Sequence, residues 1–221
     1  SFLYELNMRK PSYAMNMLPG NGWILKSNLS YEWNQFMDGF AVSEEYSTFG
    51  ANFVSHNTAR ITAEAERHFT LNKEKKIVAT LKGIGGGISE PDVDDFFHFF
   101  GGGLPGLKGY TFYEESLTGP YYFVGTAALR LPLFLEQNYT WAQFNMQNLS
   151  LGGIFQFGSA IQNSLSEIIE DDHYKLSAGL ECRLHGFSFY SYPSAISYEY
   201  HQPISDLDEQ GKHYFTLLFD Y

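Results

Sequence analysis

Apolar and polar residues alternate with a period of two along most of this chain. In the segment ARITAEAERHF, residues 59–69, every even position carries a charged or polar side chain. The apolar residues Ile61, Ala63, Ala65 and Phe69 lie between them. Successive side chains of an extended chain point to opposite faces, so alternation of this length predicts a β-strand and not a helix.

The chain contains about nine segments with strand character and no convincing helical segment. Short connections are expected at 71–75 and around Gly186, and long ones at 37–52, 87–120, 161–173 and 203–211. The link 135–148 is long where a short turn is expected, and no linker or shift of composition divides residues 1–221. The prediction is one all-β, antiparallel region. Its strands are expected at residues 2–9, 23–34, 59–69, 75–86, 121–134, 149–160, 174–185, 187–202 and 212–221.

Composition bears on whether this β-protein faces water or lipid. Charged residues make up 18% of the chain, below the roughly 25% of an average domain, and aromatic residues make up another 18%. Aromatic girdles, with short turns at one end and long loops at the other, are typical of a transmembrane β-barrel. A soluble β-sandwich or barrel that binds a ligand is the alternative. The aromatic residues that end the apolar faces are Phe2, Tyr4, Trp23, Tyr31, Trp33, Phe219 and Tyr221.

Several functional classes find no support in the sequence. The net charge of −11 argues against nucleic-acid binding, and the single Cys182 excludes an internal disulfide and a thiolate metal cage. Leu107 separates Gly106 from Lys108, which breaks the spacing of a phosphate-binding loop. The seven histidines show no metal-binding spacing, and no nucleophile motif occurs. We therefore expect no enzyme activity, no catalytic residues, no metal and no cofactor.

Residues 97–134, FHFFGGGLPGLKGYTFYEESLTGPYYFVGTAALRLPLF, carry two motifs. The segment resembles the bacterial surface antigen superfamily of BamA/TamA-like and two-partner-secretion barrels. The large loop of that family reads F-x-x-G-G-x-x-x-(V/L)-R-G-(F/Y), and its next strand ends in E-x-R-x-P-L. The second pattern is matched by Ala128, Arg130, Pro132 and Leu133. The loop pattern is matched by Phe99, Gly102, Gly103, Leu107, Lys108, Gly109 and Tyr110.

The resemblance covers the chain from about Ala59 to Tyr221. It implies a barrel of about sixteen strands in the bacterial outer membrane, of which this chain is the C-terminal portion. It implies a role in outer-membrane protein assembly or protein translocation. The implied partners are outer-membrane lipid and lipopolysaccharide, unfolded client proteins and periplasmic accessory proteins. An anchoring or pore-forming barrel fused to a periplasmic domain, such as a propeller, is the alternative.

In that family the large loop folds back into the barrel lumen, where its cation pairs with an acid on an inward-facing strand position. Here the cation is Lys108, and Gln156 stands where the family has the acid. The hypothesis is that Lys108 contacts Gln156 and an inward carboxylate, with Glu181 the first candidate and Glu199 the second, on a lumen wall that includes Arg130. A lysine lying free in a solvated lumen is the alternative.

The last residues, HYFTLLFDY, resemble the C-terminal signal for outer-membrane insertion. Phe215, Leu217, Phe219 and Tyr221 alternate up to a terminal aromatic residue, and Thr216 stands where that signal has glycine. In the family mechanism, the first and last strands pair poorly and leave a seam for a client strand. The seam strand of this chain would be residues 212–221. An edge strand of a soluble protein is the alternative.

Overall fold

The computed structural model describes residues 1–10, 19–43, 48–91, 93–161, 174–189 and 192–219. Within these ranges the protein is built on one large antiparallel sheet, and no helix is both long and apolar enough to cross a membrane. The strands of the sheet, in spatial order, are β1 (Phe2–Asn7), β2 (Gly22–Ser43), β3 (Thr48–Asn72), β4 (Ile77–Ile88), β7 (Tyr121–Phe134), β9 (Phe144–Ile161), β10 (Lys175–Ser188), β11 (Tyr192–Pro203) and β12 (Lys212–Phe219), and β8 (Tyr139–Trp141) pairs with β9.

The order of strands in the sheet is the order in the chain, with every neighbouring pair antiparallel. The all-β, antiparallel prediction is therefore confirmed. Each of the nine predicted strands has a counterpart in the described residues, and the short β8 adds a tenth strand to the sheet. Five of the nine, β7 and β9–β12, follow the long loop after β4. In the described residues β1 and β12 are the two edges of this open sheet.

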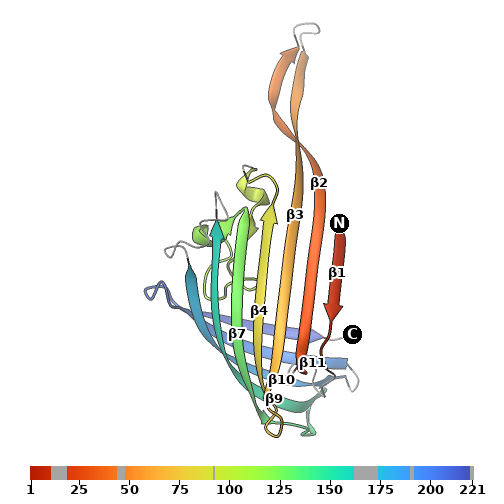
Figure 1. Ribbon diagram of the computed structural model, residues 1–221, viewed down its shortest axis with the longest axis vertical. Helices are drawn as coiled ribbons and strands as arrows, with labels where there is room; N and C mark the ends of the chain where they lie inside the picture. Colours follow the sequence, from red (N-terminus) through yellow and green to blue (C-terminus); the bar gives the residue numbers. More distant parts are fainter. Residues whose placement is uncertain (11–18, 44–47, 92, 162–173, 190–191, 220–221) are drawn as a thin grey trace.

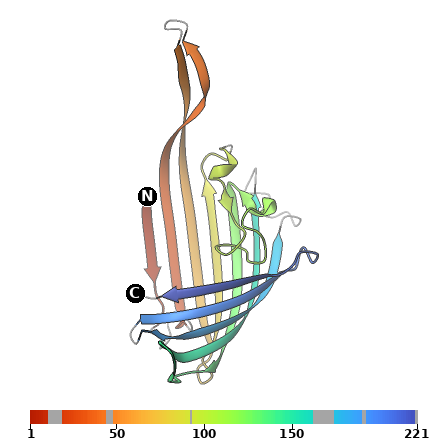
Figure 2. The same cartoon turned by 180° about the vertical axis from the view of Figure 1, so that it is seen from behind.

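The sheet is strongly curled. β2, β3, β4 and β7 run side by side along the long axis of the molecule (Figure 1). β10, β11 and β12 cross this direction and pass in front of the first strands in the reverse view (Figure 2). The long segment between β4 and β7 lies on the hollow side of this curve. We call residues 89–120, apart from residue 92, the plug loop, and the sheet face that it contacts the inner face.

Some connections differ from the predicted ones. Residues 37–52 were expected to form a loop, but the β2–β3 pairing continues through them from Met37 to Ser43, so that a hairpin rises beyond the sheet (Figure 1). Gly186 was expected in a turn but lies inside β10, where the register with β9 shifts. The turn follows Ser188 instead. A glycine in a strand marks a bulge as readily as a turn, which explains the second error.

The two faces of the sheet differ in chemistry. On β10, Glu181 and Arg183 share the inner face, whereas Leu180 on the outer face is 69% exposed. Phe215 on β12 is likewise exposed on the outer face. The predicted alternation thus places polar residues inside the curve and apolar residues outside. Other outer-face residues that remain exposed are Leu81, Leu129, Leu131, Leu151, Phe155 and Leu217.

The plug loop has little regular structure and packs against the inner face. Leu107, Tyr110 and Leu117 are buried with Val124 of β7, and Leu107 and Leu117 have no exposed surface. Because these side chains are covered by the strands, the loop is part of the core of the curled sheet. Its short elements are η1 (Asp95–Phe97), β5 (Phe99–Phe100), η2 (Glu115–Leu117) and β6 (Thr118–Gly119), with β5 paired to β6.

Candidate functional site

The tip of the plug loop is a tight reversal built on glycine. Gly103 and Gly109 have φ angles of 75° and 100°, a region that strains any residue with a Cβ atom. The Leu107 amide donates to the Gly101 carbonyl at 2.7 Å, and the Gly106 amide donates to the Gly103 carbonyl at 3.2 Å. These bonds project the next residue, Lys108, toward the inner face.

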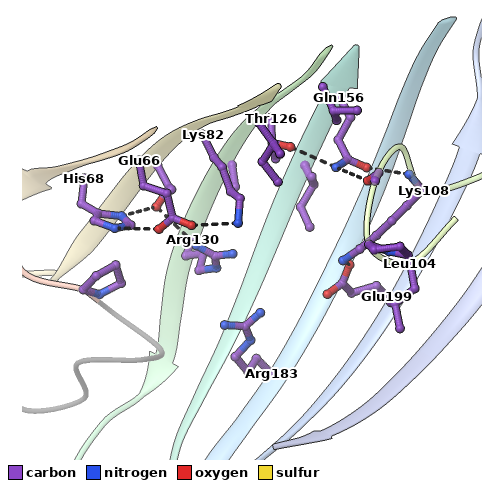
Figure 3. Close-up of a pocket in the computed structure, with 18 of the residues that line it drawn as sticks. Glu66, His68, Lys82, Leu104, Lys108, Thr126, Arg130, Gln156, Arg183 and Glu199 are labelled. Carbon is purple, nitrogen blue, oxygen red and sulfur yellow. Dashed lines mark hydrogen bonds and ion pairs between the residues drawn. The ribbon is translucent and has the colours of Figure 1, made fainter. Parts of the chain in front are cut away.

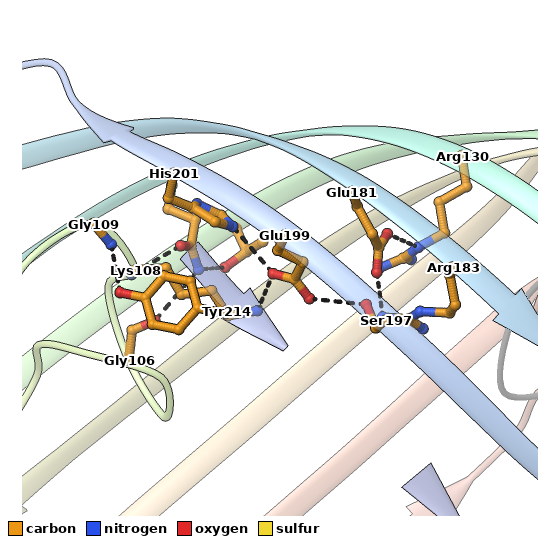
Figure 4. A network of polar contacts seen from close by, with 12 residues as sticks. Gly106, Lys108, Gly109, Arg130, Glu181, Arg183, Ser197, Glu199, His201 and Tyr214 are labelled. Atoms are coloured by element: carbon orange, nitrogen blue, oxygen red, sulfur yellow. Dashed lines mark hydrogen bonds and ion pairs between the residues drawn. The ribbon is translucent and has the colours of Figure 1, made fainter. Parts of the chain in front are cut away.

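Lys108 contacts two strands at once. Its backbone N–H donates to Gln156 Oε1 on β9 at 3.0 Å, and its ammonium pairs with Glu199 of β11 (Figures 3 and 4). Gln156 Nε2 in turn donates to Thr126 Oγ1 at 3.0 Å and to the Gly106 carbonyl at 3.4 Å. The predicted contacts with Gln156 and an inward carboxylate are both present. The glutamine, however, serves the backbone of the lysine, and the side chain meets the second candidate, Glu199.

Two more side chains contact the Glu199 carboxylate. The ring of His201 lies with Nε2 3.1 Å from Glu199 Oε2, and Ser197 Oγ donates to Glu199 Oε1 at 3.5 Å. The side chains of Glu199 and Lys108 are 7% and 18% exposed, so the lysine does not lie free in solvent. A carboxylate so far from water keeps its charge only beside a cation or strong donors. The Lys108–Glu199 pair therefore pins the loop to β11.

Two tyrosines extend the attachment. The Gly109 N–H donates to the Tyr214 hydroxyl on β12 at 2.9 Å, and the Tyr110 hydroxyl donates to the Leu176 carbonyl on β10 at 3.0 Å (Figure 4 shows Tyr214). Burial raises the pKa of Tyr110 to about 12. The tip thus bonds to β9, β10, β11 and β12. The role of Tyr214 was missed, although its place on the inner face follows from the alternation around Phe215.

Glu181 was the first candidate partner for Lys108, and this prediction is wrong. Arg130 Nε donates to Glu181 Oε2 at 2.8 Å, and Arg183 pairs with the same carboxylate, which is 1% exposed. Arg130 on β7 and Glu181 on β10 both pair in register with Gly152 of β9, the strand between them. A Cβ atom at Gly152 would lie 3.1 Å from Glu181 Oε2. The missing side chain lets the two charges meet across β9.

A third group of charges lies on β3 and β4 (Figure 3). Lys82 Nζ is 3.0 Å from both Glu64 Oε1 and Glu66 Oε1, and His68 Nε2 is 3.3 Å from Glu66 Oε2. His68 Nδ1 also lies 3.0 Å from Thr80 Oγ1. The sequence indicated the acidic face of β3 but not Lys82. In the β3–β4 register, which shifts by one residue between Thr70 and Asn72, Lys82 lies opposite Glu66. Counting back from the turn without this shift would place Gly83 there, so the sequence alone did not reveal the pair.

A cavity of about 330 Å³ separates the loop tip from these charge groups. Its walls include Lys82, Lys108, Arg130 and Glu199. Each of these charges has an opposite charge within salt-bridge distance. In the described ranges no cluster of His, Cys, Asp and Glu residues is suited to hold a metal ion. The arrangement is suited to holding a loop inside a polar interior.

The C-terminal motif is described in part. Phe215 and Leu217 lie on the outer face of β12 and are 72% and 50% exposed, and Phe219 pairs through its backbone with Ser194. Tyr221 lies outside the described residues. Comparison with known proteins adds nothing to this geometry: no family model, no curated protein and no solved structure matches the chain.

Proposed function

We propose that this chain is part of a plugged β-barrel in the bacterial outer membrane, similar to the BamA/TamA-like barrels, that assembles outer-membrane proteins or translocates proteins. The observation that carries the proposal is the docked loop tip. A glycine-rich loop ending in Leu107-Lys108-Gly109-Tyr110 lies on the inner face of a curled sheet and is pinned there by Glu199. The role is mechanical and needs no catalytic side chain.

The outer face supports a lipid-facing wall. Leu180 and Phe215, about 70% exposed, belong to an apolar surface that continues over β4, β7, β9 and β10. Contiguous apolar surface of this kind is rare on soluble monomers. β4, β7 and β10 have 12, 14 and 14 residues, enough for the roughly 9–11 residues of a tilted span. Inside the curve, Lys82, Lys108 and Arg130 each pair with a carboxylate, as a partly dehydrated interior favours.

A free strand edge supports a role in assembly or translocation. β12 pairs with β11 along eight residues, and its other edge has no partner strand among the described residues. An edge with free N–H and C=O groups is a template for an incoming strand. A barrel that only anchors a fused periplasmic domain needs no such edge, which distinguishes the two roles experimentally.

The membrane part of the proposal is tested by extracting the protein from membranes and comparing boiled and unboiled samples in detergent gels. A folded barrel migrates differently before and after heating and inserts into liposomes. A protein that is compact and monodisperse in plain buffer, without detergent or lipid, would refute the membrane assignment.

The assembly part is tested by site-specific photocrosslinking. A photoreactive residue replaces Leu217 on the edge strand or, as a matched control, Leu129 on β7, which is paired on both sides. Both side chains lie on the outer face and are 50% and 41% exposed. A stalled outer-membrane barrel precursor is expected to crosslink at position 217 and not at 129. Equal capture at both positions, or none, favours the anchoring role.

A further inference from the structure

A second cavity, of about 480 Å³, lies where β8 and β9 form a hairpin. It shares no lining residue with the cavity beside the plug loop. Lys76, in the turn between β3 and β4, pairs with Glu136 at 3.1 Å, so the cavity lies at the short-turn end of the sheet. The lining residues are Glu136, Gln137, Asn138, Thr140, Gln143, Asn145, Gln147 and Phe187.

The polar groups of this cavity are organised before any ligand binds. Asn145 Nδ2 donates to Asn138 Oδ1 and, at 3.0 Å, to Thr140 Oγ1, which orients the Asn145 amide. Its Oδ1 atom is buried and has no hydrogen-bond partner in the described structure. The Asn145 amide is thus held in one orientation beside the cavity.

The backbone around the cavity is strained as well. Glu136 and Ala142 have φ angles of 56° and 54°, a conformation that residues other than glycine rarely adopt. Such strain persists where surrounding contacts enforce it, and it is concentrated at functional sites. Here the Glu136 N–H donates to Asn148 Oδ1 at 2.9 Å, and the Gln137 N–H donates to the Gln147 carbonyl at 2.9 Å. These bonds hold the hairpin in its bent form.

The lining defines the class of ligand. Five of the eight side chains are Asn or Gln amides, each of which both donates and accepts hydrogen bonds, and the lining includes no lysine, arginine or aliphatic residue. A phosphate or carboxylate would lack a cation, and an apolar ligand would lack aliphatic contacts. The Phe187 ring supplies one flat apolar surface. Hydroxyl groups around a flat C–H face are the chemistry of a pyranose sugar.

We propose that this cavity is a binding site for an uncharged oligosaccharide, in which the amide side chains bond its hydroxyl or acetamido groups and Phe187 packs against one sugar ring. The site can be tested apart from the proposed membrane role, because all of its residues come from β10 and the β8–β9 hairpin with its approach from β7.

The test is calorimetric titration of the purified full chain with three probes: the tetrasaccharides of N-acetylglucosamine, β-glucose and α-glucose. At least one is expected to bind with a Kd of about 1 mM or tighter. Gln143→Ala, at an exposed position that leaves the fold intact, and Phe187→Leu should each weaken binding about tenfold. Gln35→Ala, an exposed amide on the β2–β3 hairpin, is the control and should bind normally. Absence of binding for all three probes, or normal binding by Gln143→Ala and Phe187→Leu, would overturn the proposal.

Discussion

Breaking the Lys108–Glu199 pair should release the plug loop from the inner face. Lys108→Met removes the cation and leaves Glu199, 7% exposed, with His201 beside it. Breaking a buried pair costs about 3–5 kcal/mol, and losing an exposed one about 0–1 kcal/mol. Because the Lys108 side chain is 18% exposed and His201 remains, we expect a loss of about 2–3 kcal/mol. The population with an open loop should rise about 30- to 150-fold.

Amide hydrogen exchange measures this opening directly, since exchange requires the bonds of the loop tip to break. The Lys108 and Gly109 amides donate to Gln156 and Tyr214 at 3.0 and 2.9 Å, so both should exchange faster by the same factor. Glu199→Gln should act similarly. The double variant should lose less than the sum of the two changes, because neither charge is left buried alone.

The matched control is Lys76→Met, which breaks the pair between Lys76 and Glu136, whose side chains are 43% and 58% exposed. Its effect on exchange at the loop tip should stay within experimental error, because the pair is exposed and lies outside the tip. Unchanged exchange at Gly109 in both single variants would show that the ion pair does not hold the loop, and the reasoning above would fail.

Three further predictions concern the loop and the two faces. Gly86→Ala should speed amide exchange in the plug loop, because the added Cβ would lie 2.7 Å from the Tyr122 ring; Gly153→Ala, with nothing within 4 Å, should not. The pKa of Tyr110 rises to about 12 in the docked loop from about 10 when exposed. Docking of the loop should therefore be fully stable below about pH 10 and weaken as the pH rises toward 12. Limited proteolysis of the loop should show a smaller loss of protection over this pH range in Tyr110→Phe. An equal loss of protection in both proteins would contradict the role of this hydroxyl. Leu180→Lys should cost about 2–4 kcal/mol in denaturant unfolding from liposomes if it faces the bilayer core, and no loss would argue for a water-facing surface.

The fold could be predicted from the sequence to the level of strands and faces. The period of two belongs to the extended backbone itself, so Glu181 and Leu180 had to lie on opposite faces in any sheet. The positions at which the strands end could be predicted less well. Residues 37–52 looked polar enough for a loop, yet paired backbones continue through Gly39, because two strands can bond each other without burying either face.

The sequence predicted which residues form the candidate site, but not which acid pairs with which cation. The loop motif and the acids of the inner face were identified from the sequence, and Lys108 does meet an inward carboxylate. Glu181 was assigned to the wrong cation, since nothing local reveals that Gly152 lies between it and Arg130, 51 positions earlier. A glycine can mark a turn, a bulge or a gap between two larger side chains, and only the neighbouring strands distinguish these uses.

By itself the sequence determined that the chain forms antiparallel strands, which side chains share a face, and that a glycine-rich segment interrupts them. The tertiary structure alone decided which charges neutralise one another and where the loop is attached. The physical reason is the sequence distance over which each feature is set. The alternation of side chains is set by each residue and its immediate neighbours. The contact between Lys108 and Glu199, 91 positions apart, instead depends on the register of every strand between them and on the curl that brings β11 to the loop.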